Sequence, residues 1–291
     1  MSETSSKQTG LMQTAMTEAA LSRPSAGRLP GGRSGLRGSV VMEWVKLRTM
    51  RSTWWTLAIT LVGMIGLAIL VLQHYPGHWT QMSHADRTSF DPTNDGFIGV
   101  ALAQLVMAVL GVLAITGEYS SGMIQSTLVA VPRRGLVLAA KAIVVGGVAL
   151  VVGEIAAFAT FVAGQAVLVS PAPHATLGQP GVLRAVLLAG VYLALIALIG
   201  LGIGAIVRRS AAAIAVIAGL IFVLPPVLLA LPTGIQHSVG RFLPEIIAES
   251  SLTAVRPEAF SLSAWAGLGM LGLYAVALLG AGGWLLSRRD A

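Results

Sequence analysis

The stretch AVLLAGVYLALIALIGLGIGAIV (185–207), followed by Arg208, Arg209 and Ser210 and then by AAAIAVIAGLIFVLPPVLLAL (211–231), decides the fold of this 291-residue chain. Neither run contains a charged residue, and each can cross about 30 Å of hydrocarbon as a helix that rises 1.5 Å per residue. The runs lack the alternating pattern of a strand, and a backbone in lipid must satisfy its own hydrogen bonds. They therefore predict two membrane-spanning helices joined by a short basic turn.

Four further runs have the same apolar character. They cover residues 54–72, 97–116, 142–169 and 261–286, and Glu154 is the one charged residue among them. The composition agrees, with 55% hydrophobic and 11% charged residues and a mean hydropathy of +0.80. Soluble domains carry about a quarter of their residues as charged types, so a soluble enzyme is excluded. We expect an all-α polytopic membrane protein with six transmembrane helices between residues 54 and 287.

The basic residues predict the orientation of these spans. If the N-terminus is inside, the inner segments hold fifteen of the nineteen: Lys7, Arg23, Arg28, Arg33, Arg37, Lys46, Arg48, Arg51, Arg133, Arg134, Lys141, Arg208, Arg209, Arg288 and Arg289. The outer loops hold four, Arg87, Arg184, Arg241 and Arg256. The positive-inside rule then places both termini in the cytoplasm, with the spans in the plasma membrane. Topology accounts for the net charge of +7, and no nucleic-acid partner is expected.

Two segments precede the first span. Residues 1–39 are rich in Ser, Thr, Gly and Arg and contain no apolar region of signal-peptide length, so a flexible cytoplasmic tail is expected. Residues 40–53 (VVMEWVKLRTMRST) have an amphipathic pattern typical of a helix that lies along the lipid headgroups. Two interpretations stay open: an anchor for the first span, and an elbow helix that also contacts a cytoplasmic partner.

The inner loop at residues 117–141 is the most informative segment. Met123, Ile124 and Leu128 recur at helical spacing, and they predict a short amphipathic helix over 118–131. Glu118 would lie near its N-terminus, where a carboxylate is favoured, and Pro132 would end it. A helix parallel to the membrane between two spans is suited to receive a push from a soluble domain.

Here the sequence resembles a known family. Glu118, Gly122, Leu128, Pro132 and Lys141 resemble the inner-loop pattern E-x3-G…L…P…K of ABC transporter permeases of the type-2 exporter class. The run formed by Glu43, Lys46, Arg48 and Arg51 is similar to the elbow helix of that class, and so is the basic ending of the last span at 287–290. The resemblance covers about residues 40–291.

The resemblance implies the permease half of an ATP-driven exporter. A second copy, as a homodimer or heterodimer, would complete the pathway, and separate ATP-binding cassette ATPase subunits would supply hydrolysis. The chain agrees, because its lysines, Lys7, Lys46 and Lys141, lie outside any phosphate-binding loop. We therefore expect no enzyme activity and no cofactor in this chain, with ATP bound by the partner. The residues expected to couple to the ATPase are Glu118, Gly122, Met123, Ile124, Leu128 and Pro132, while Lys141 is expected to snorkel to the headgroups.

Ionisable residues elsewhere favour no catalytic or metal site. Glu154 is costly in mid-membrane; it is either a pathway or proton-relay residue, or a neutral carboxyl bonded within the bundle, for example to Gln104. The five histidines lie in expected outer loops, and Pro76 and Gly77 are expected to break the helical geometry that His74 and His78 would need to bind a metal.

Two other functions remain open at this point. One is a secondary transporter driven by an ion gradient, which would need several intramembrane ionisable residues. The other is a non-transporting scaffold or immunity protein. Between the last two spans, residues 238–243 and 244–252 are expected to form two short helices.

Overall fold

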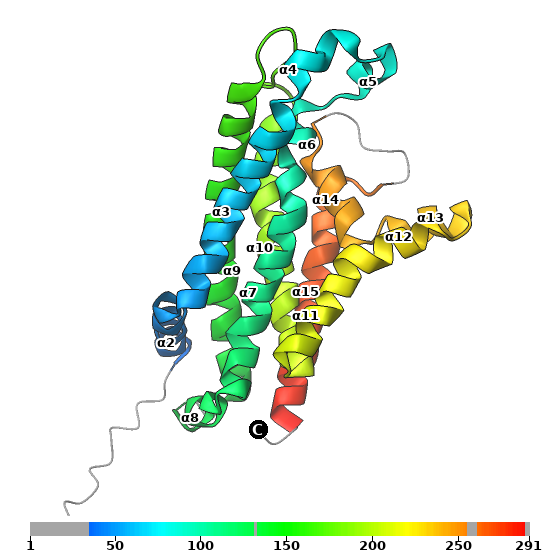
Figure 1. Cartoon of the computed structure of the whole chain (residues 1–291). Helices are drawn as coiled ribbons and strands as arrows, with labels where there is room; N and C mark the ends of the chain where they lie inside the picture. The colour runs from blue at the N-terminus through cyan, green and yellow to red at the C-terminus, as the bar shows by residue number, and fades with distance from the viewer. Residues whose placement is uncertain (1–34, 131–132, 255–260, 289–291) are drawn as a thin grey trace, which may run out of the picture. The chain divides into compact units, whose positions relative to one another are not determined.

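The computed structural model describes residues 35–130, 133–254 and 261–288, and these residues are helical with no strand among them. Six helices are long and apolar enough to cross a membrane, as the sequence predicted. The spans are built on α3 (Arg51–Leu72), α7 (Val100–Ser120), α9 (Arg134–Val167), α10 (Val182–Val207), α11 (Ser210–Ala218) with its continuation, and α15 (Ala264–Arg288). They run side by side as one bundle (Figure 1).

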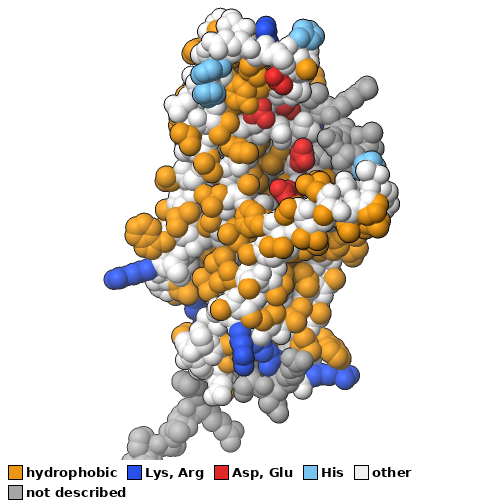
Figure 2. All heavy atoms as spheres, turned by 45° about the vertical axis from the view of Figure 1, so that its right-hand side comes forward, with side chains coloured by type: hydrophobic (Ala, Val, Ile, Leu, Met, Phe, Trp, Pro, Cys, Tyr) orange, Lys and Arg blue, Asp and Glu red, His pale blue; other side chains and the backbone are white. Residues whose placement is uncertain are grey.

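The surface of the bundle is divided into an apolar middle and charged ends. Hydrophobic side chains cover the middle of the face seen in Figure 2, most Lys and Arg lie toward the end where the C-terminus lies, and Asp, Glu and His gather toward the other end. Exposed apolar residues occur on every span, among them Val62, Val151 and Val276. Such a band is what lipid requires of a membrane protein surface.

Helix α10 is the core of the bundle. Its apolar window is 78% buried, whereas that of α3 is 22% buried, because α7, α9 and α15 all pack against α10. Small residues permit this close packing. A Cβ on Gly111 of α7 would overlap the carbonyl oxygen of Ala197, and a Cβ on Gly200 of α10 would overlap that of Ala108.

The fifth span is not a regular helix. After α11 the chain makes a π-helical turn, Gly219–Val223, and continues as α12 (Leu224–Leu229). Pro225 and Pro226 follow the turn directly, and because proline has no amide proton, the helical hydrogen-bond ladder must change there. Only 22% of this span's apolar window is buried.

Short helices lie between the last two spans. Helix α14 (Pro244–Leu252) occupies the expected range and starts with proline in its first turn. Helix α13 covers Thr233–Gly240, so the expectation of a helix at 238–243 was wrong. Pro232, with an extended ψ, is the residue that precedes this earlier start.

The loop after α3 also folds into short helices. They are α4 (Tyr75–His78), η1 (Trp79–Gln81), α5 (His84–Ser89), α6 (Pro92–Gly96) and η2 (Phe97–Gly99). The expectation that Pro76 and Gly77 would break helical geometry was wrong: Pro76 lies in the first turn of α4, and the rings of His74 and His78 stack 3.9 Å apart. The described residues contain no group of three or more His, Cys, Asp or Glu suited to a metal ion.

Three boundaries differ from those expected at the end of the bundle where the C-terminus lies, which we call the inner end after its place in the expected topology (Figure 1). The elbow helix, α2, covers Leu36–Thr49, and an extended Met50 separates it from α3, so Arg51 belongs to the first span. The loop helix, α8, covers Met123–Ala130, because α7 continues to Ser120 and Gly122 turns the chain at φ +70°. Helix α9 begins at Arg134, eight residues before the expected span. Most of the expected tail, residues 1–34, and Pro132 lie outside the described residues.

The contacts of Gly111 and Gly200 generate a stability prediction. Gly111→Ala and Gly200→Ala should each lower the free energy of unfolding by about 1–3 kcal/mol, because α7 and α10 must move apart to admit a methyl group. Thermal unfolding of the detergent-purified protein would measure this. Gly147→Ala on α9, where an added Cβ meets nothing within 4 Å, is the matched control and should not lower the midpoint. Equal midpoints for all three variants would contradict the packing argument.

Candidate functional site

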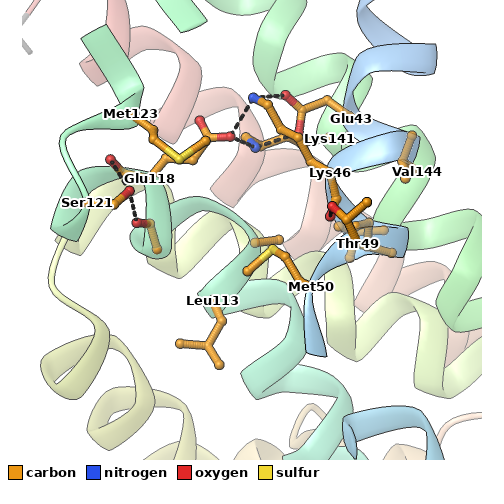
Figure 3. Close-up of a pocket in the computed structure, with 14 residues that line it drawn as sticks. Glu43, Lys46, Thr49, Met50, Leu113, Glu118, Ser121, Met123, Lys141 and Val144 are labelled. Carbon is orange, nitrogen blue, oxygen red and sulfur yellow. Dashed lines mark hydrogen bonds and ion pairs between the residues drawn. The ribbon is translucent and has the colours of Figure 1, made fainter. Parts of the chain in front are cut away.

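Four charged side chains from three helices meet at the inner end of the bundle (Figure 3). Glu43 and Lys46 come from α2, Glu118 from the last turn of α7, and Lys141 from the third turn of α9. Glu43 and Lys46 are one helical turn apart, so both point from one face of α2 toward the bundle. We call these four residues the charge cluster.

The hydrogen bonds of the charge cluster are short. The Lys141 ammonium donates to Glu43 Oε2 at 2.6 Å and to Glu118 Oε1 at 2.7 Å. Lys46 donates to Glu118 Oε1 at 2.8 Å, to Glu43 Oε1 at 3.1 Å and to Thr127 Oγ1 of α8 at 3.1 Å. Each lysine therefore bridges α2 to α7, and Lys141 adds α9.

Burial makes these contacts more than surface ion pairs. The exposed fractions are 2% for Lys141, 4% for Glu43 and 7% for Glu118. The cluster is neutral overall, with two carboxylates and two ammonium groups, and a buried charge is tolerated when it is paired and hydrogen-bonded. Removal of one partner would leave an uncompensated charge, so Glu43, Glu118 and Lys141 must be buried together.

Lys46 lies at the edge of the charge cluster and is partly exposed. Partial burial disfavours its charged form, but the hydrogen bond to Glu118 and the charges of Glu43 and Glu118 outweigh this, and the pKa of Lys46 is raised. A raised pKa means that the stabilisation from Lys46 is complete at neutral pH. It is lost only as the pH rises through that raised pKa, in strong alkali.

The loop helix α8 is held against this cluster by one face. Ile124 and Thr127, one turn apart, are buried, and Thr127 accepts the hydrogen bond from Lys46. Met123 and Val129 are exposed at 47% and 83%. The expectation that Ile124 would contact a partner was wrong, because its side chain is used in packing within this chain.

Two arginines connect the inner loops to the last span. Arg134, at the start of α9, donates to the carbonyl oxygen of Leu286 at 2.8 Å, and Arg208, after α10, donates to that of Leu285 at 3.2 Å. Both carbonyls lie in the last turn of α15, where helical carbonyls lack partners and a positive charge is favoured. The inner ends of α9, α10 and α15 are thereby tied together.

The structure brings together some of the expected site residues and separates others. Glu43, Lys46 and Glu118 meet, whereas Arg48 and Arg51 are exposed and take no part in the charge cluster. Glu118 belongs to α7 instead of α8, and the expectation that Lys141 snorkels to the headgroups was wrong, since two carboxylates hold it inside. Leu128 lies on α8, but its side chain is outside the described part, as is Pro132.

Glu154 lies on α9 against Gly190 of α10. A Cβ at Gly190 would be 2.5 Å from the carboxyl carbon of Glu154, so only glycine leaves room for this side chain. The side chain of Gln104 bonds elsewhere, since its Oε1 accepts from the Tyr192 hydroxyl, and the described residues show no hydrogen bond from Gln104 to Glu154. Within the described residues Glu154 Oε2 is buried with no hydrogen-bond partner.

These observations define a polytopic helical membrane protein with an amphipathic helix and a loop helix joined to its spans by buried ion pairs. Residues 39–226 match the model of the ABC-2 family transporter proteins. The chain therefore belongs to the ABC-2 transporter family and is a permease, the transmembrane component of an ABC transporter. A comparison with curated proteins gives no match.

The burial pattern predicts that the two lysines differ in their effect on stability. Lys141→Met should cost about 3–5 kcal/mol of unfolding free energy, because it leaves two buried carboxylates without a compensating charge. Lys46→Met should cost clearly less, since the side chain of Lys46 is 22% exposed and water can replace part of its interaction. Thermal unfolding in detergent would measure both variants. An equal loss for the two would show that burial does not decide the energetics here.

Proposed function

We propose that this chain is the membrane subunit of an ATP-driven exporter, whose loop helix α8 is the contact for a separate ATP-binding cassette ATPase. The observation that carries the proposal is the division of α8 between attachment and exposure: Ile124 and Thr127 are buried and Thr127 accepts a hydrogen bond from Lys46, whereas Val129 is 83% exposed and Met123, which also borders the cavity beside the charge cluster, is 47% exposed. An exposed apolar face on a helix at one end of a membrane bundle fits a groove on a soluble partner. A second permease copy would complete the pathway, and ATP would be bound by the partner alone.

The transmission of force follows from the contacts. A push on α8 acts on Lys46 through Thr127, and from Lys46 on Glu43 and Glu118. It therefore acts on α2 and α7 together, and through Lys141 on α9. A helix attached at one point to one span could only bend the loop, whereas this arrangement moves the inner ends of three helices.

A substitution pair tests the coupling role of α8. Met123→Asp and Val129→Asp together should abolish co-purification of vanadate-sensitive ATP hydrolysis, because they place two charges in the proposed apolar contact. The unfolding midpoint should stay near that of the wild type, since both residues are exposed. Ala85→Asp, on the exposed helix α5 at the other end of the bundle, is the control and should keep the ATPase. Wild-type ATPase recovery with the double variant would contradict the role of α8.

The proposed orientation places both termini and α8 in the cytoplasm. The chain contains no cysteine, so single cysteines can report sidedness without background. A membrane-impermeant maleimide added to intact cells should label Ala85→Cys and not Ser126→Cys, and permeabilisation should make Ser126→Cys reactive. The reverse pattern would invert the topology and would separate α8 from any cytoplasmic ATPase.

A further inference from the structure

A cavity of about 310 Å³ lies beside the charge cluster (Figure 3). The charged side chains of Glu43, Lys46, Glu118 and Lys141 line one end of it. Its other walls are largely apolar and include Met50, Leu113, Ala114, Val144 and Val145. At about 30 Å³ per water molecule, the cavity has room for roughly ten water molecules. Most of its wall is apolar, however, and offers them no hydrogen-bond partner.

The two ends of the cavity lie at different depths in the bundle. Leu113 and Ala114 precede Glu118 by about one turn of α7, and Val144 and Val145 follow Lys141 by about one turn of α9. Both displacements lead from the inner end toward the middle of the bundle. The cavity thus has a polar floor at the level of the amphipathic helix α2 and apolar walls at membrane depth, which is the polarity of a lipid in the adjacent leaflet.

The polar floor has unused hydrogen-bonding capacity. Lys46 donates all three of its protons, and each oxygen of Glu43 accepts one hydrogen bond from a lysine. Among the described residues, Glu118 Oε2 is buried and has no hydrogen-bond partner, although Oε1 accepts from both lysines. Lys141 donates two of its three protons. Glu118 and Lys141 both line the cavity, so a buried acceptor without a partner and an ammonium with one proton to donate are found among its lining residues.

We propose that this cavity binds one aminophospholipid of the leaflet on the side of α2, with its primary ammonium on Glu118 Oε2. The lipid phosphate or an ester oxygen would accept the remaining proton of Lys141. A zwitterionic headgroup suits a charge cluster that is already neutral, because it adds no net charge to a buried site. The acyl chains would leave along Leu113 and Val145 toward the bilayer. This site does not depend on an ATPase partner, so its test is separate from that of the exporter proposal.

The N–H groups of the headgroup give the sharpest test. Native mass spectrometry of the full-length protein in detergent would be titrated with dioleoyl phosphatidylethanolamine and, separately, with dioleoyl phosphatidylcholine. We expect one retained phosphatidylethanolamine with about a tenfold preference or more, since the choline headgroup cannot donate a hydrogen bond to a buried carboxylate. The N-methyl and N,N-dimethyl lipids, which keep an N–H, should still be retained. Equal retention of all four lipids, or retention of none, would mean that the cavity does not select an N–H headgroup and would overturn the proposal.

A cavity-filling variant places the lipid in this site. Gly117 lines the cavity, and an added Cβ there meets nothing within 4 Å, so Gly117→Leu should place its side chain in the space beside the charge cluster. This variant should retain phosphatidylethanolamine and phosphatidylcholine about equally. Gly147→Leu, on an exposed position of α9 outside the cavity, is the matched control and should keep the preference. A preference that survives Gly117→Leu would show that the lipid binds elsewhere and would overturn the proposal.

Discussion

The requirement that two carboxylates and two ammonium groups be buried together determines the inner end of this protein. Glu43, Glu118 and Lys141 come from helices far apart in the chain, and none could be buried alone at a bearable free-energy cost. The cluster therefore fixes α2, α7 and α9 relative to one another within hydrogen-bond distances. Helix α9 begins earlier than expected because residues 135–140 are apolar too, and Val137, Leu138 and Ala140 are buried against the bundle.

This constraint gives the amphipathic helix a role beyond anchoring. Were α2 held only by lipid, a push on α8 of the kind proposed for coupling would reach the spans through the chain connection alone. Because Lys46 contacts Glu118 and Thr127 at once, α2 and α8 move with the end of α7. The bonds from Arg134 and Arg208 to the last turn of α15 extend the connection to the sixth span. Contiguous packed and hydrogen-bonded elements of this kind are what can carry coupling between distant sites.

The sequence predicts the spans well and the charge cluster poorly, for a physical reason. The number of spans depends on the length and composition of local runs of sequence. Residues 185–231, for example, contain two uncharged runs that are each long enough to cross a membrane. The partner of Lys141 depends on which helices meet, and no local pattern states that. A lysine at the end of a span usually extends its ammonium group to the lipid headgroups. Lys141 does not, because a carboxylate oxygen of Glu43 and one of Glu118 lie within 3 Å of its Nζ. The signal that was present is the pair of carboxylates, Glu43 and Glu118, in inner segments that otherwise carry many Lys and Arg residues. Similarly, Gly122 could have marked the break between α7 and α8, since its φ is +70°.

The fixed inner end contrasts with the fifth span, and the contrast locates where the bundle can deform. Helix α10 is packed on all sides and tied at its inner end, so bending it would break many contacts at once. The fifth span has little protein around it, and its regular hydrogen bonding is already interrupted by the turn at Gly219–Val223 and the prolines that follow. Elements with few buried contacts and missing backbone bonds cost least to rearrange. In the proposed coupling, a force applied at the rigid charge cluster would therefore deform α11 and α12 at the lowest free-energy cost, and the firmly held inner end and the weakly packed fifth span would serve the same movement.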